Sequence, residues 1–117
     1  MVVGLKMGLT ALRRLNARGW FDLRCRVSLP WRPPDSCIID GIQCSTGCTM
    51  GKHNINVEEK EGIAADFYKE GEHLKVMLRQ EVVKKIRRAL AKDGDVPLDN
   101  LIKELIEAHE KDLFQIS

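Results

Sequence analysis

The sequence predicts a single α+β domain that runs in the order helix, strand, helix, three strands and two helices. Apolar residues recur every three or four positions at both ends of the chain, and they alternate with polar residues in the middle. A chain of 117 residues has room for one hydrophobic core but not for two. The hydrophobic fraction of 44% and the charged fraction of 31% are typical of globular domains.

The first helix is predicted from one apolar face and is expected to end at Gly19. That face consists of Val2, Leu5, Leu9, Leu12 and Leu15. Gly4 and Gly8 lie near it, one turn apart. Because neither has a side chain, we expect another element to pack closely against this helix.

A strand and a second helix follow. Apolar and polar residues alternate over residues 21–29, which is typical of a half-buried strand, and Cys25 is then a small core residue. Two prolines break the chain, after which Asp35 or Ser36 can cap a helix. The apolar wall of this helix is Ile38, Ile39 and Ile42. We expect it to end near Gly47.

Three short alternating runs and two helical patterns complete the chain. The runs are Ile55 and Val57, then Ala65 and Phe67, then Leu74, Val76 and Leu78. We expect these three strands to form an antiparallel meander. The tail helices carry Val82, Val83, Ile86 and Leu90, and then, after Pro97, Leu98, Leu101, Ile102, Leu105, Ile106 and Leu113. Residues 1–80 are therefore interpreted as an α+β unit, and residues 81–117 as a helical appendage packed on the same domain.

The segment that carries chemistry is residues 36–56, SCIIDGIQCSTGCTMGKHNIN, called the signature segment below. If it is helical, then Cys37, Asp40, Cys44 and Cys48 share one face. Thiolates, a carboxylate and the imidazole of His53 are suitable ligands for zinc or another transition metal. However, a straight helix separates Cys37 from Cys48 by about 16 Å. A metal site therefore combines Cys44 or Cys48 with His53, or Cys37 and Asp40 with ligands from elsewhere in the fold or from a second subunit.

Cys48 is also a candidate nucleophile, with His53 as its base and Lys52 lowering its pKa. Core packing is the competing interpretation, about equally weighted for Cys37 and Cys44 and less favoured for Cys48, which is expected in a loop. Lys52 is not followed by Ser or Thr, so the glycine-containing loop is not a nucleotide-binding phosphate loop.

Bulk charge and hydropathy exclude several classes of function. The net charge of +2 gives no case for nucleic acid binding. No apolar run approaches the length of a membrane span, so we expect a cytoplasmic protein with reduced cysteines.

The signature segment resembles that of the FmdE component of formylmethanofuran dehydrogenase and its stand-alone relatives. The resemblance rests on residues 37–43, 46–52 and 54–55, and it covers roughly residues 2–80. It implies a helix, strand, helix, three-strand fold with a mixed sheet. It also implies an accessory role beside molybdenum or tungsten enzymes of one-carbon metabolism, in which another subunit carries the redox cofactor. The positions that match the family motif are Cys37, Asp40, Gln43, Thr46, Cys48, Lys52 and Asn54.

The chain departs from the family pattern in three places. A His-x-His motif usually stands just before the glycine that corresponds to Gly4, so we expect either a start codon assigned downstream or the loss of those ligands. A terminal Cys-x-x-Cys zinc ribbon, common in relatives, is absent after Gln80. Position 53, commonly Gly, is His53 here.

Three hypotheses follow from the sequence. The first is a non-catalytic metal-binding accessory domain, with Cys37, Asp40, Cys48 and His53 as candidate ligands. It forms a homodimer through the sheet or the tail helices and associates with subunits of a molybdenum or tungsten dehydrogenase. The second is a small thiol-dependent enzyme or redox protein that uses Cys48. The third is a structural interaction module whose motif preserves the fold.

Overall fold

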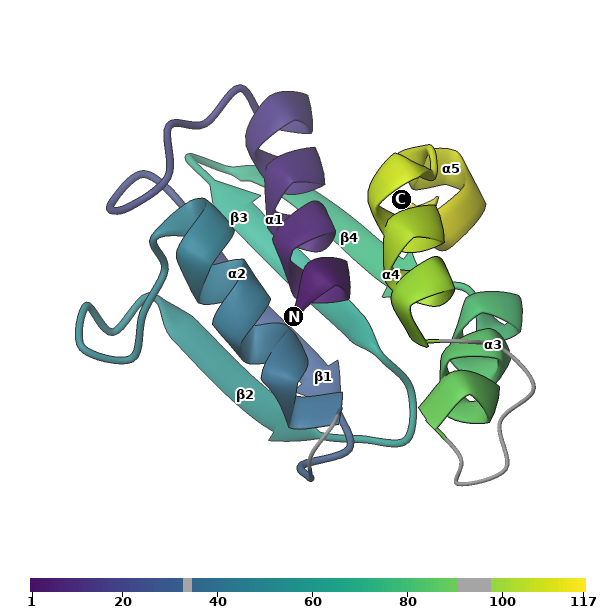
Figure 1. The fold of residues 1–117 in the computed structure, drawn as a ribbon. Helices are drawn as coiled ribbons and strands as arrows, with labels where there is room; N and C mark the ends of the chain where they lie inside the picture. Colours follow the sequence, from purple (N-terminus) through teal and green to yellow (C-terminus); the bar gives the residue numbers. More distant parts are fainter. Residues whose placement is uncertain (33–34, 91–97) are drawn as a thin grey trace.

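The computed structural model describes residues 1–32, 35–90 and 98–117 (Figure 1). Its helices are α1 (Val2–Arg14), α2 (Ile38–Thr46), α3 (Gln80–Leu90), α4 (Leu98–Glu107) and α5 (Glu110–Leu113), and a 3-10 turn, η1 (Asp35–Cys37), precedes α2. Its strands are β1 (Arg24–Leu29), β2 (Ile55–Glu59), β3 (Ala64–Lys69), β4 (Glu72–Leu78) and β5 (Phe114–Ile116). The predicted α+β class is thereby confirmed, and so is the mixed sheet that the family resemblance implies.

The five strands form one sheet in the order β2-β1-β3-β4-β5. β1 pairs in parallel with β2 and antiparallel with β3, and β4 pairs antiparallel with both β3 and β5. The predicted three-strand meander is therefore wrong, because β1 lies between β2 and β3. α2 connects β1 to β2, which is the crossover that parallel neighbours need.

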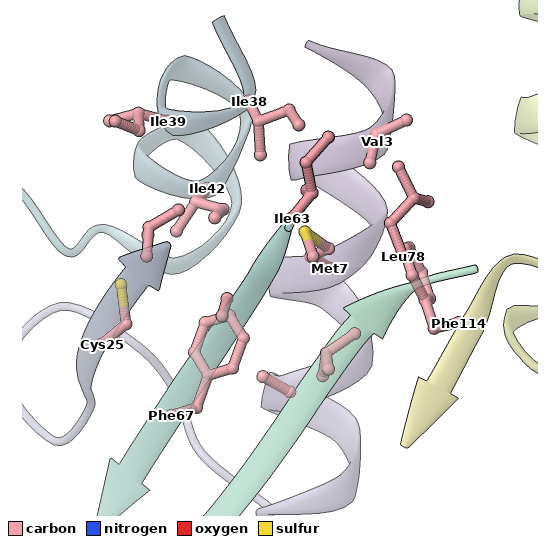
Figure 2. Close-up of a cluster of buried hydrophobic side chains, with 14 of the residues drawn as sticks. Val3, Met7, Cys25, Ile38, Ile39, Ile42, Ile63, Phe67, Leu78 and Phe114 are labelled. Carbon is pink, nitrogen blue, oxygen red and sulfur yellow. The ribbon is translucent and has the colours of Figure 1, made fainter. Parts of the chain in front are cut away.

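Helices α1 and α2 lie side by side over one face of the sheet (Figure 1). Between them and the sheet lies a core that contains Met7, Ile42 and Phe67, all fully buried (Figure 2). A Cβ atom added at Gly4 would collide with the backbone carbonyl of Ile38, so the close approach predicted for this helix is confirmed.

The ends of the first two helices differ in how well the sequence predicts them. α2 gives way to Gly47 at φ +74°, as predicted. α1 ends at Arg14 rather than Gly19, because Asn16 adopts a positive φ of 52° and turns the chain. Leu15 reaches the core, but the predicted apolar face is wrong, because Leu5 and Leu9 are 38% and 51% exposed and the buried apolar side chains of α1 are Val3, Met7 and Ala11.

The predicted second tail helix is interrupted. His109 adopts an extended conformation, and its ring accepts a hydrogen bond from the Lys111 amide, so α4 and α5 are separate helices. β5 then pairs with β4, a strand that the sequence did not predict. In the part of the chain that the structure describes, no helix has the length and hydropathy of a membrane span.

Candidate functional site

The signature segment divides into two groups of side chains that lie apart. The first group belongs to α2 and lines a cleft of about 620 Å³ beside β2. The polar lining residues are Ser36, Cys37, Asp40, Gln43 and Glu59. The apolar lining residues are Trp31, Ile39, Met50 and Val57. We call this concavity the α2–β2 cleft.

Cys37, Asp40 and Gln43 lie in one row along α2 because they are three residues apart. Cys37 is the N-cap of α2 and is half-buried, whereas Asp40 is exposed. Neighbouring side chains in such a row have Cβ atoms roughly 5–6 Å apart. α2 thus offers the cleft one thiol and one carboxylate within reach of a common ligand, with the Gln43 amide one further turn away.

The second group, in residues 46–54, fastens the loop before β2 to the turn before β1. The buried Thr46 hydroxyl donates to the Ile42 carbonyl at 2.6 Å and accepts from the Cys48 amide at 3.1 Å. The Asn54 side chain accepts from the Thr49 amide at 2.8 Å and donates to the Trp20 carbonyl. These motif residues hold the backbone in place, so they have a structural reason to be present.

The Cys48 thiol is fully buried, although the sequence places it in a loop where function is favoured over packing. Its Sγ donates to the carbonyl of Leu23 at 3.2 Å. The second thiol beside it is that of Cys25, which is 2% exposed. A hydrogen bond between the two thiols lowers the pKa of Cys48 to about 7, while burial opposes that shift. The same hydrogen bond, together with burial, raises the pKa of Cys25.

Lys52 and His53 lie at the surface of this loop. The Lys52 ammonium lies 4.8 Å from the centre of the Trp20 ring, which is a cation–π contact. His53 is exposed, with a positive φ of 60°. Among the described residues no hydrogen bond joins His53 to Cys48, so the geometry does not pair the proposed base with the proposed nucleophile.

The four candidate metal ligands are not brought together within one chain. Within residues 1–32, 35–90 and 98–117, no group of three or more His, Cys, Asp or Glu side chains is placed to hold a metal ion. Cys37 and Asp40 share the α2–β2 cleft, whereas Cys48 lies beyond the other end of α2. Cys44 is exposed and is not among the cleft residues.

Sequence reasoning missed several residues that shape the two groups. Trp31, Met50 and Glu59 complete the cleft, although they come from three different segments. Asp22 accepts hydrogen bonds from the amides of Arg18 and Gly19, both at 2.8 Å, and the bond from Arg18 lowers the pKa of its carboxyl. An exposed Trp or Met beside the motif is a usable signal for a cleft, whereas nothing in the local pattern indicates that Cys25 meets Cys48.

Comparison with known protein families gives one match. A family model described as "FmdE, Molybdenum formylmethanofuran dehydrogenase operon" matches residues 1–115. This match extends beyond the resemblance seen over residues 2–80, and it includes α3, α4, α5 and most of β5. No curated protein matches the chain.

Proposed function

The chain belongs to the FmdE family, which is linked to the operon of molybdenum formylmethanofuran dehydrogenase, and on that premise we propose that it is a non-catalytic accessory domain that binds a metal ion. The metal is zinc or a similar divalent transition metal, and the Cys37 thiolate and the Asp40 carboxylate bind it in the α2–β2 cleft. The accessory domain associates with subunits of the dehydrogenase and carries no redox cofactor of its own.

The observation that carries this proposal is the shared position of Cys37 and Asp40 on the wall of a single cleft. A soft thiolate beside a carboxylate is a donor combination typical of zinc sites. Trp31, Ile39 and Met50 line the same cleft and add apolar surface beside these donors. The bound ion supplies a positive charge that fixes the two side chains in one orientation.

Two ligands do not complete a tetrahedral site, so water molecules or donors from a second protein chain fill the remaining positions. A second copy of this chain and a subunit of the dehydrogenase are both suitable sources. The cleft is open at the molecular surface, since Asp40 is exposed and Trp31 and Met50 are 58% and 61% exposed. A partner chain can therefore reach the donors without rearrangement of the fold.

The other two hypotheses receive unequal support. A thiol-dependent enzyme needs an accessible nucleophile, and the Cys48 thiol has no exposed surface and no base bonded to it. A structural role suits Thr46, Cys48 and Asn54, which bind backbone groups. It does not account for Cys37 and Asp40, because neither side chain forms a hydrogen bond with another residue that the structure describes.

Elemental analysis of purified protein, dialysed against zinc-containing and then zinc-free buffer, tests the proposal. We expect near-stoichiometric metal in the wild type and at least about a tenfold loss of affinity in Cys37→Ser and in Asp40→Asn, because each variant removes a ligand. Cobalt(II) substitution gives a second readout, since a thiolate-to-cobalt absorption band is expected to disappear in Cys37→Ser alone.

Cys44→Ser is the matched control, because Cys44 is an exposed cysteine on the same helix that does not line the cleft. Cys48→Ala is expected to keep its metal while losing stability. Wild-type protein without metal, or equal metal content in all four variants, would contradict the proposal.

A further inference from the structure

Among the residues that the structure describes, strand β2 has an unpaired outer edge. It is the outermost strand of the sheet, on the side away from α3, α4 and α5 (Figure 1). The Cys25 amide donates to the Asn54 carbonyl and the Lys60 amide donates to the Leu29 carbonyl, both at 3.0 Å. Because successive residues of a strand bond to opposite sides, the backbone groups of Ile55, Val57 and Glu59 point away from β1. No strand pairs with them among the residues that the structure describes.

Exposed strand edges are usually blocked by proline, a bulge or an inward-pointing charge. β2 has none of these at its centre, where Val57 is half-buried against the α2–β2 cleft. We propose that this edge pairs antiparallel with β2 of a second copy of the chain, and that the pairing delivers His53 of the second copy to the cleft that holds Cys37 and Asp40.

The sequence of the strand fits a twofold axis through Val57. In this register Val57 lies opposite Val57 of the second copy, and the Asn56 amide lies opposite the Glu58 carboxylate of the second copy. A register centred on Glu58 would instead place two carboxylates opposite each other, which is unfavourable. The charge pattern of β2 is thus compatible with its own antiparallel copy in the register centred on Val57 and disfavours the register centred on Glu58.

Two exposed apolar side chains lie at opposite ends of the same edge. Trp31 follows β1 close to Leu29, which pairs with Glu59, whereas Met50 precedes the start of β2 at Ile55. An antiparallel arrangement therefore places Trp31 of each chain near Met50 of the other chain. Burying an aromatic side chain and a methionine is typical of the centre of a protein interface.

The same arrangement adds a third ligand to the metal site, a step that rests on the proposed function. Cys37 lies at the Glu59 end of the cleft, because α2 begins shortly after Leu29 and Leu29 pairs with Glu59. His53 lies at the opposite end of β2, exposed and without a partner for its ring in the described part of the chain. Twofold symmetry thus exchanges the two ends, so that each cleft receives an imidazole that its own chain cannot supply.

The dimer itself is tested without metal, by sedimentation of the protein in EDTA. We expect twice the chain mass of 13.3 kDa for the wild type. Asn56→Glu is expected to weaken the dimer by about tenfold, because it opposes Glu58 at two symmetric positions, and Asn56→Lys is expected not to weaken it. Within one chain Asn56 pairs with Arg26, so the glutamate is the better tolerated of the two in the monomer. A monomeric wild type, or equal effects of both variants, would overturn the edge pairing.

The delivery of His53 is tested by mixing two variants that each lack one ligand. Cys37→Ser and His53→Ala are each expected to lose metal, and an equimolar mixture refolded together is expected to regain about a quarter of the wild-type sites. The gain follows because half of the dimers are mixed and one of their two sites is intact. A mixture that regains nothing, or a His53→Ala variant that keeps its metal, would overturn the delivery.

The two proposals fail in different ways. A wild type that binds metal as a monomer leaves the proposed function standing and removes the dimer. A wild type that dimerises through β2 but binds no metal removes the proposed function and the delivery of His53, and it leaves the edge pairing standing.

Discussion

Cys48 has a thiol pKa lowered to about 7 and no exposed surface, so its acidity and its burial predict opposite reactivities. If acidity decided, Cys48 would react first with iodoacetamide near neutral pH. We expect burial to decide, because the reagent has to reach the sulfur. Alkylation followed by mass spectrometry should therefore modify exposed Cys44 first, half-buried Cys37 next, and Cys25 and Cys48 only after unfolding.

The control for this order is the same reaction in denaturant, where all four thiols are expected to react at similar rates. Rapid alkylation of Cys48 in the folded protein, slowed by His53→Ala, would instead support a thiol-dependent enzyme. The position of Cys48 was beyond prediction from the sequence, because packing against Leu23 and Cys25 joins residues more than twenty positions apart.

At the scale of elements, the contact between α1 and α2 depends on glycines that leave no room for a side chain. Gly4→Ala raises intrinsic helix propensity by about 1 kcal/mol, which alone would stabilise the protein. However, the added methyl group would meet the backbone carbonyl of Ile38, which cannot rotate away as a side chain can. We expect the collision to prevail and to lower the free energy of unfolding by about 1–3 kcal/mol, measured by urea denaturation.

Gly51→Ala is the matched control for this substitution. Gly51 lies in the signature segment, and a Cβ atom added there has no neighbour within 4 Å. Its stability is expected to change by less than about 0.5 kcal/mol. Equal stability of Gly4→Ala and wild type would mean that the two helices move apart more readily than their packing indicates.

The sequence predicted the position of several helices and strands, but it did not predict how the strands pair. Apolar period located α1, α2 and β1, because this signal is local to a few residues, and Gly47 marked the end of α2. The predicted N-cap of α2, Asp35 or Ser36, is wrong, because Cys37 occupies that position without a side-chain cap hydrogen bond. The partner of β2 was not predictable in this way, because alternation fixes which face of a strand is buried but not which strand lies beside it. The family resemblance supplied the mixed sheet, and helix rise already separated Cys37 from Cys48, whereas only the folded chain shows that Cys48 is buried beside Cys25.

At the scale of the whole molecule, the C-terminal segment is held to the first helix by charge. The Glu110 carboxylate is 9% exposed and binds both Arg13 and Arg14, the latter at 2.7 Å. The Lys6 ammonium donates to the carbonyls of Leu105 and Ile106, both at 3.0 Å, and so caps the end of α4. These contacts place β5 where it can pair with β4 and close that side of the sheet.

Glu110→Ala is therefore expected to release the tail as a unit. Removal of a carboxylate that binds two guanidinium groups should lower the free energy of unfolding by about 1 kcal/mol, since Arg13 and Arg14 are 68% and 37% exposed and water replaces their lost partner. Hydrogen exchange should quicken at the amides of Lys75, Arg79 and Ser117, which bond across this junction, and remain unchanged in β1 and β2. Glu107→Ala, an exposed glutamate on α4, is the control and should leave both readouts unaltered. Uniformly faster exchange throughout the sheet would mean that the tail and the remainder of the domain unfold together, so that the charged contacts stabilise the whole fold and not the junction alone.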